Sequence, residues 1–260
     1  MNSSSRKLWI GTSWKMNKVR AEAVSFAADL KASSWTEQTP VQMFVIPPFP
    51  YIAEVADVLQ HTSVRTGAQN MHWQSEGAWT GEVSPTMLQD CGATIVELGH
   101  SERRTHFNET DEAVGLKVRA ALQHDLIPLV CIGDTREEYD AQQSTPALEK
   151  QVRAALGKVD VAAAGRVLFA YEPVWSIGEH GVAADPDFVN EQHRQIKNTT
   201  LEITGLELPV LYGGSVTLAN CVNFVRKPLV DGLFIGRAAW ASQGYLAIIQ
   251  AVSEEVLNAD

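Results

Sequence analysis

Cysteine is scarce in this chain, which has only three cysteines, Cys91, Cys131 and Cys221, among 260 residues. The number is odd, and the three lie far apart in apolar surroundings, which argues against a disulfide framework and favours a reducing, cytoplasmic compartment. No Cys-x-x-Cys pair and no Cys/His spacing indicates a zinc site. We therefore expect neither a metal nor another cofactor.

The chain also lacks an excess of positive charge and any long apolar run. Lysine and arginine total 21 against 31 aspartates and glutamates, so the net charge is −10. Binding of a nucleic acid requires a basic surface, so we expect no nucleic-acid partner. No run is long enough to span a membrane, and the short polar segment 1–7 has no apolar core of a signal peptide. An anionic substrate would be held by locally oriented donors.

Short apolar runs are present throughout, and they alternate with amphipathic segments. Hydrophobic residues make up 45% of the chain, enough for a sizeable core. The spacing predicts strands over 8–11, 43–46, 64–68, 94–98, 127–132, 167–171, 210–212 and 233–235. It predicts helices over segments that include 20–31, 111–124, 146–157 and 186–204.

Eight strands alternating with helices predict a single α/β domain, a (β/α)₈ barrel over residues 1–260. An open doubly wound sheet is the alternative, but no GxGxxG opens its first turn. Ser84-Pro85 and Asp185-Pro186 are typical helix starts. Gly157, Gly165 and Gly205 are expected at helix ends.

Residues 69–82 form the longest connection without a helical pattern. The segment carries Met71, Trp73 and Trp79, which a monomer would expose at a cost. We interpret it as an arm at a subunit interface and expect a homodimer; a mobile surface loop is the alternative.

Glu172 follows the apolar strand 167–171 directly, and the stiff Pro173-Val174-Trp175 follows Glu172. The glycine-bearing segment 176–181 comes next, so a rigid hinge and glycines are combined as a closing lid requires. A carboxylate under a lid that excludes water has a raised pKa and can act as a general base near neutrality. The alternative is a strand-end glutamate that caps a helix or pairs with a lysine.

Further chemical groups stand at other strand ends, which share one face in a barrel. Lys15 suits an anion, His100 can donate a hydrogen bond to a carbonyl oxygen, and Glu172 can take a carbon-bound proton. Residues 213–215 and Gly236 offer backbone N–H groups and a hydroxyl to a phosphate.

Each of these residues also has an ordinary structural explanation. Lys15 alone is more often a solvated lysine and His100 a structural histidine. Ser101 can cap the following helix, and Glu102 can pair with an arginine. Their joint occurrence at the strand ends of one barrel favours a site.

Six motifs resemble the triose-phosphate isomerase family across nearly the whole chain. They are WKMN (14–17), GAQN (67–70), TGE (80–82), ELGHSERR (97–104), YEPVW (171–175) and YGGSV (212–216). The resemblance implies that Glu172 is the enolising base, His100 the neutral electrophile and Lys15 the electrostatic anchor. It also implies that Glu102 supports Lys15, that 173–183 is the lid that grips a phosphate, and that Thr80 lies near the partner's site.

The substrate implied is a small phosphorylated sugar. Substrate contacts are expected from Ser13, Gly178, Ser215, Gly236 and Arg237, and supporting roles from Ser101, Glu102, Tyr212 and Thr80.

Four departures from the triose pattern indicate a different substrate. Ser13 stands where an asparagine is usual, and Arg237 where a second glycine is usual. The lid reads IGEHGV over 177–182, and Asp134 replaces a glutamate. Because Lys15, His100 and Glu172 are intact, altered substrate explains these changes better than lost function.

The motifs GTSWK (11–15) and FIGR (234–237) resemble the erythrulose-phosphate isomerase branch of the family. That branch implies the interconversion of L-erythrulose 1-phosphate and D-erythrulose 4-phosphate through an enediol, with Ser13 providing room for a hydroxymethyl group. A triose-phosphate isomerase with altered loops and a catalytically silent sugar-phosphate-binding barrel are the alternatives.

Overall fold

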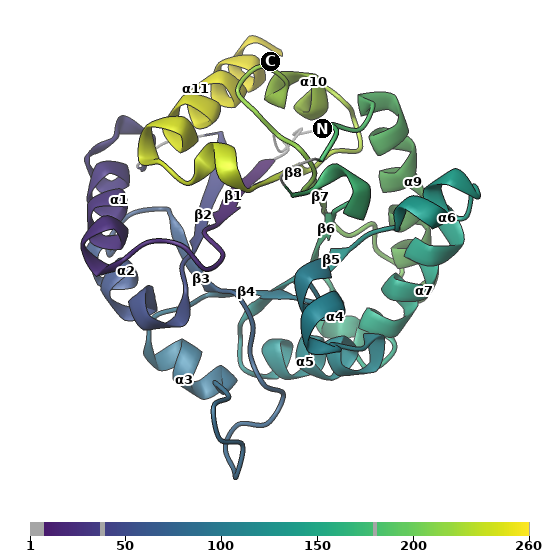
Figure 1. Ribbon diagram of the computed structural model, residues 1–260, viewed down its shortest axis with the longest axis horizontal. Coiled ribbons are helices and arrows are strands. Elements are labelled where there is room, and N and C mark those ends of the chain that lie inside the picture. Colours follow the sequence, from purple (N-terminus) through teal and green to yellow (C-terminus); the bar gives the residue numbers. More distant parts are fainter. Residues whose placement is uncertain (1–7, 37–39, 179–180, 260) are drawn as a thin grey trace.

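Eight parallel strands close into a barrel in chain order, with β8 paired back to β1 (Figure 1). The computed structural model describes residues 8–36, 40–178 and 181–259. The strands are β1 (Leu8–Ser13), β2 (Val41–Ile46), β3 (Arg65–Ala68), β4 (Ile95–Leu98), β5 (Ile127–Ile132), β6 (Leu168–Tyr171), β7 (Val210–Tyr212) and β8 (Gly232–Ile235). The predicted fold class is therefore confirmed, and the open sheet is excluded.

Each predicted strand is present, although several ends differ by one or two residues. Two ends differ by two residues: β2 begins at Val41, and β1 continues to Ser13 because its register with β2 extends to the pair Ser13 and Ile46. The extra length brings Ser13 to the carboxyl rim of the barrel.

The helices form a ring around the strands, as the view down the barrel shows (Figure 1). They are α1 (Arg20–Ala32), α2 (Ile52–Val58), α3 (Pro85–Asp90), α4 (Ser101–Phe107), α5 (Asp111–Gln123), α6 (Arg136–Asp140), α7 (Ser144–Leu156), α8 (Val161–Ala164), α9 (Pro186–Thr204), α10 (Cys221–Val225) and α11 (Ser242–Ala259). Single 3₁₀ turns are η1 (Ser34–Thr36), η2 (Phe49–Tyr51), η3 (Val174–Ser176) and η4 (Arg237–Ala239).

The predicted helix starts are capped as expected. The Ser84 side chain accepts from the Met87 N–H, and the Asp185 side chain accepts from the first turn of α9. These bonds satisfy backbone donors that have no partner within the helix. Gly205 ends α9 in the left-handed conformation, with φ of 76°.

The core has two layers, one inside the barrel and one between the strands and the helices. Successive residues of a strand face opposite sides of the sheet. In β4, Ile95 belongs to the inner layer, whereas Val96 and Leu98 belong to the outer one. Glu97 therefore faces the inside of the barrel.

Residues 69–82 leave the carboxyl end of β3 and reach beyond the ring of helices before α3 begins (Figure 1). The expectation that its apolar side chains are exposed is wrong for Met71, which is fully buried in this chain's own core. Trp79 is 48% exposed, although its ring lies 4.3 Å from that of His72. One large apolar side chain thus remains at the tip.

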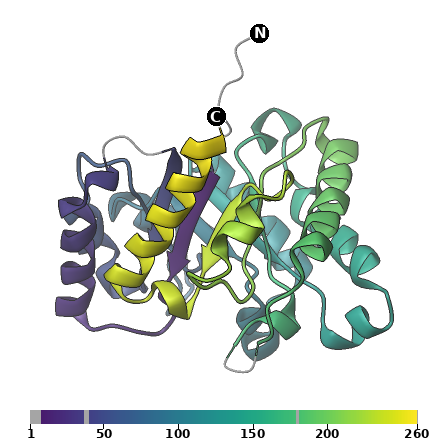
Figure 2. The ribbon, with the colours of Figure 1, turned by 90° about the horizontal axis from the view of Figure 1, so that it is seen from above.

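The two rims of the barrel differ. Seen from the side, β1 points toward the lower rim and α11 ends at the upper one (Figure 2).

No described helix combines the length and the apolar character needed to cross a membrane. The segment 1–7, on which the signal-peptide expectation rests, lies outside the described residues.

Candidate active site

A cavity of about 510 Å³ opens at the carboxyl ends of the strands, a volume typical of small-molecule sites. Among the predicted site residues, its lining includes Ser13, Lys15, His100, Glu102, Glu172, Gly178, Ser215, Gly236 and Arg237. The other three predicted residues, Ser101, Tyr212 and Thr80, are not among the described residues that line the cavity.

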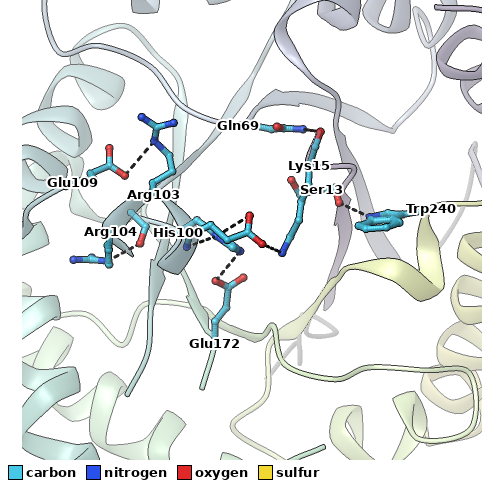
Figure 3. Close-up of polar contacts among 11 residues, drawn as sticks. Ser13, Lys15, Gln69, His100, Arg103, Arg104, Glu109, Glu172 and Trp240 are labelled. Carbon is cyan, nitrogen blue, oxygen red and sulfur yellow. Dashed lines mark hydrogen bonds and ion pairs between the residues drawn. The ribbon is translucent and has the colours of Figure 1, made fainter. Parts of the chain in front are cut away.

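Two regions of this cavity differ in kind. We call Ser13, Lys15, Glu97, His100 and Glu172 the charged end. We call Gly178, residues 213–215, Gly236 and Arg237 the glycine end. Figure 3 shows Lys15, His100 and Glu172 of the charged end pointing toward one another from different parts of the barrel.

Lys15 occupies a backbone conformation that side chains rarely adopt, with φ of 53°. The amide of Gln69 donates to the Lys15 carbonyl oxygen at 2.9 Å, which helps to hold this turn in place. The ammonium lies 2.5 Å from Glu102 Oε1. Burial alone would lower the pKa of Lys15, but the hydrogen bond and charge of Glu102 outweigh it and the pKa is raised. Lys15 is therefore a cation that Glu102 holds in place.

His100 is held as a neutral imidazole with a defined tautomer. It caps α4, and its Nδ1 accepts a hydrogen bond from the Glu102 N–H at 3.1 Å. Because Nδ1 is the acceptor, the proton of the neutral ring must reside on Nε2. Burial, and then the charge of Lys15, lower the pKa of His100 to about 4. The suggested cap at Ser101 is thus replaced by His100 itself.

Glu172 lies beside His100, with Oε2 at 3.6 Å from His100 Nε2. It follows β6, and its N–H donates to the Ile132 carbonyl oxygen at 2.8 Å. Its side chain is 4% exposed. Burial raises the pKa of Glu172 well above its usual range, and the nearby charge of Glu97 adds to this effect. The raised pKa predicted for this carboxylate agrees with its surroundings.

The glycine end is built mainly from backbone. A Cβ at Gly213 would lie 2.6 Å from Glu172 Cγ, so only glycine leaves the carboxylate its place. The Gly213 N–H donates to the Tyr171 carbonyl oxygen at 2.9 Å, which makes it a strand contact and not the phosphate donor expected from the sequence. Nothing lies within 4 Å of a Cβ placed on Gly236. Arg237 is exposed at the rim.

The segment after Glu172 is anchored by a buried carboxylate. Asp134 accepts hydrogen bonds from the Trp175 indole at 3.2 Å, the Tyr171 hydroxyl at 2.9 Å and the Ser144 hydroxyl at 2.8 Å. The predicted hinge 173–175 is therefore tied to the end of β5 and to α7.

The other end of this segment is tied to β7. The Ala184 N–H donates to the Tyr212 hydroxyl at 3.2 Å, and the Ser176 hydroxyl lies 3.0 Å from the same oxygen. Ser215 donates its N–H to Ser176 at 3.2 Å and its hydroxyl to the Gly181 carbonyl at 3.3 Å. In this conformation the N–H and the hydroxyl of Ser215 bind the segment after Glu172. The sequence alone assigns both donors to a phosphate. Residues 179 and 180 of the expected lid lie outside the described residues.

Trp240 and Glu97 are polar residues of the cavity to which the sequence analysis gave no role. Trp240 lines the cavity, and its indole donates to the Ser13 carbonyl at 3.0 Å (Figure 3). Glu97 lines it as well and is only 3% exposed. A charge within the otherwise apolar run 95–98 was the available signal for Glu97.

Residues of the types that bind metal ions do not form a cluster in the part of the chain that the structure describes. There, no group of three or more histidine, cysteine, aspartate or glutamate side chains could hold an ion. The described site offers instead a base, a neutral hydrogen-bond donor and a cation around one cavity, a combination suited to proton abstraction beside a carbonyl.

Comparison with known proteins relates this geometry to one family. The family model described as triosephosphate isomerase matches residues 8–252. A protein of Brucella abortus named L-erythrulose-1-phosphate isomerase is 52% identical over 251 residues, covering 96% of this chain and 98% of its own. A protein of Rhizobium meliloti with the same name is 51% identical, with the same two coverages. One of Mesorhizobium japonicum, also so named, is 49% identical over 95% of this chain and 98% of its own.

Proposed function

The chain belongs to the triosephosphate isomerase family, and from that premise we propose that it interconverts L-erythrulose 1-phosphate and D-erythrulose 4-phosphate. The family and the names of the similar proteins support an enzyme that isomerises sugar phosphates. The observation that carries the proposal is the meeting of Lys15, His100 and Glu172 around one cavity. We propose that the barrel is a single domain and needs no cofactor.

The reaction is a proton transfer between two neighbouring carbons. Glu172 removes the proton from C3 of L-erythrulose 1-phosphate, and the electron pair of the C–H bond forms the C2–C3 double bond of an enediolate. The hydroxyl proton on C3 passes to the oxygen on C2, a transfer that the Nε2–H of His100 can mediate, while the protonated Glu172 returns a proton to C2. The carbonyl group thus forms at the old C3. Numbering from the other end makes this product a 4-phosphate. A base with a raised pKa is matched to both steps near neutrality.

His100 and Lys15 stabilise the negative charge that develops on the oxygens. The tautomer of His100 directs an Nε2–H toward the cavity, and the ring's low pKa keeps it neutral. A neutral imidazole can polarise the carbonyl through its Nε2–H and exchange that proton with an enediolate oxygen. Lys15 adds a fixed positive charge, positioned by Glu102.

The phosphate group occupies the glycine end in this proposal. Gly178, Ser215, Gly236 and Arg237 are its expected contacts, and all four line the cavity. The lid anchors at Asp134 and Tyr212 keep this segment over Glu172 and limit the access of water. Ser101 and Glu102 complete the support around His100.

A triose-phosphate isomerase is the alternative, because the same three groups would serve the shared atoms of both substrates. Ser13 favours the tetrose: it is 4% exposed and smaller than the asparagine usual in triose enzymes, which leaves space for one hydroxymethyl group. A silent sugar-phosphate-binding barrel is a weaker alternative because the catalytic groups are intact.

Rates on both substrates decide among these functions. The purified protein is assayed with L-erythrulose 1-phosphate and with dihydroxyacetone phosphate, and kcat/KM is compared. We expect a clear preference for the tetrose. A preference for the triose would support the alternative, and no turnover of either would support the silent barrel.

We further propose a homodimer formed through the arm 69–82. The exposed Trp79 at its tip supports an apolar contact with a partner, and Thr80 would then lie near the partner's cavity. The mass in solution at micromolar concentration tests this, together with Trp79→Ser, which should raise the monomer fraction. A monomeric wild-type protein would contradict the dimer.

A cytoplasmic role in erythritol catabolism is also part of the proposal. The free thiols of Cys91, Cys131 and Cys221 are compatible with a reducing compartment. Deleting the gene should abolish growth on erythritol and leave growth on glucose intact; unimpaired growth on erythritol would contradict this role.

A further inference from the structure

Glu97 is a buried carboxyl group for which the proposed proton transfer has no use. It lies in β4 with its side chain directed into the barrel, next to the inner apolar layer, and it is 3% exposed. A buried charge in such surroundings is costly unless it is paired or has a function. It lines the same cavity as Glu172 and Lys15.

The hydrogen bonds of Glu97 are incomplete. Its carboxyl group lies close enough to Ser13 for the Ser13 side chain to lower its pKa. Its second oxygen, Oε2, is buried and has no hydrogen-bond partner among the described residues. A carboxyl oxygen left in this state at the wall of a substrate cavity points to a missing polar partner.

The chemistry of the cavity narrows the identity of that partner. A phosphate would be repelled by a carboxylate, and the glycine end already suits it. The carbonyl oxygen and the hydroxyl on C3, which exchange roles during the reaction, have His100 and Lys15. The remaining polar group of a four-carbon ketose phosphate, at the end away from the phosphate, is the terminal hydroxyl of its hydroxymethyl group. A triose phosphate lacks this additional group.

We propose that Glu97, together with Ser13, binds the terminal hydroxymethyl group of the substrate and so selects a tetrose phosphate over a triose phosphate. This inference rests on the proposed function. Ser13 has two parts in it: it is small enough to leave room for the extra carbon, and its hydroxyl holds Glu97 in position.

The state of Glu97 near neutrality fits a hydroxyl ligand. Burial raises the pKa of Glu97 to about 7, partly offset by the Ser13 side chain and the charge of Lys15. The group is therefore present in both protonation states. A hydroxyl both donates and accepts, so it can pair with either state.

The selectivity expected from such a contact exceeds that from space alone. Accommodating or rejecting one methylene is worth roughly 10–200-fold, whereas a site that hydrogen-bonds a hydroxyl rejects an analogue without it by up to about 10⁴–10⁵-fold. A triose bound here would leave Glu97 Oε2 without its partner.

The test compares Glu97→Val and Glu97→Gln with the wild type, using kcat/KM on L-erythrulose 1-phosphate and on dihydroxyacetone phosphate. Valine removes both hydrogen-bonding oxygens, so the ratio of tetrose to triose kcat/KM should fall by about 10²-fold or more. Glutamine keeps a donor and an acceptor, and its ratio should stay within about tenfold of the wild type. Glu112→Gln, on the exposed face of α5, is the matched control and should change neither rate.

The outcomes separate this inference from the proposed function. A wild type that does not convert the tetrose would refute the function itself. A wild type that converts it, combined with equal losses on both substrates in Glu97→Val, would overturn the inference alone. An unchanged ratio in Glu97→Val, or an equally large fall in Glu97→Gln, would also overturn it. Inhibition by inorganic phosphate, expected to be unaltered, reports that the variants keep a folded glycine end.

Discussion

The charged end of the cavity consists mainly of buried ionisable side chains, whereas the glycine end consists mainly of backbone groups. At the charged end, burial shifts the pKa values of side chains that are only a few per cent exposed: it raises those of Glu172 and Glu97 and lowers that of His100. The glycine end presents backbone and the hydroxyl of Ser215, and most of its residues carry no charge. In the proposed function, reactivity is therefore concentrated at the charged end and phosphate binding at the glycine end. Substitutions at the two ends should affect kcat and KM differently.

The strongest test of this division is Glu172→Asp. Shortening the side chain by one methylene moves the carboxylate by roughly 1 Å, and such a displacement can cost about 10²-fold or more in kcat. Because the glycine end is untouched, inhibition by inorganic phosphate should change little. Steady-state kinetics with both substrates measure the effect. Turnover close to that of the wild type would exclude Glu172 as the base.

His100→Gln should lower kcat by about 10²–10³-fold, because the Nε2–H donor acts mainly on the enediolate. The variant retains a polar side chain, so its fold should be preserved, which thermal unfolding can check. A rise in KM with unchanged kcat would instead place His100 among the groups that only bind substrate.

Two glycines of the glycine end differ in their neighbours, because a Cβ on Gly213 would meet Glu172 of the charged end and a Cβ on Gly236 would meet nothing. Gly213→Ala would place a methyl group 2.6 Å from Glu172 Cγ, so we expect kcat to fall on the order of 10²-fold. Gly236→Ala meets no atom within 4 Å, and it should mainly raise KM, by about tenfold, through crowding of the phosphate. Equal effects of the two on kcat would show that contact with Glu172 is not what makes the Gly213 position sensitive.

Ser13→Asn tests the space at the charged end. Asparagine should refill the room for the hydroxymethyl group and lower kcat/KM on erythrulose phosphate by roughly 10–200-fold, with little loss or some gain on the triose. Ser13→Ala is the control for size. Equal losses on both substrates with Ser13→Asn would show that this position does not distinguish the fourth carbon.

The smallest effect concerns pH. The base must be deprotonated, so kcat/KM falls as the pH drops through the pKa of Glu172, which lies above the usual carboxyl range. Glu97→Gln removes a charge that raises this pKa, so the acid limb of the profile should move to lower pH. An unchanged limb would mean that Glu97 is not charged in the working enzyme.

The pH dependence of the unfolding free energy provides a second test of the ionisation of Glu97. A carboxyl group with a raised pKa in the folded state contributes stability below its unfolded pKa, and this is lost as the pH rises through the folded value. For Glu97, with a folded pKa of about 7 against 4.5, that window runs from about pH 4.5 to 7. Glu97→Gln should flatten the loss of unfolding free energy across this window, and denaturant titrations at several pH values measure it.

The sequence by itself determined the barrel and most of the candidate site. Apolar runs of strand length alternating with amphipathic segments depend on local residue order, so all eight strands were predictable. The position of Glu172 after β6 and of His100 after β4 followed from the same pattern. Helix caps such as Asp185 were equally local.

Tertiary structure alone decided how these residues are connected. The closing of the barrel buried Met71 and brought the two donors of Ser215 to the expected lid segment. It also turned Glu97 toward Ser13 and left one of its oxygens unpartnered within the described chain. Burial and hydrogen bonding between residues far apart in the chain depend on how the strands meet, and these contacts set the pKa values that local sequence patterns do not contain.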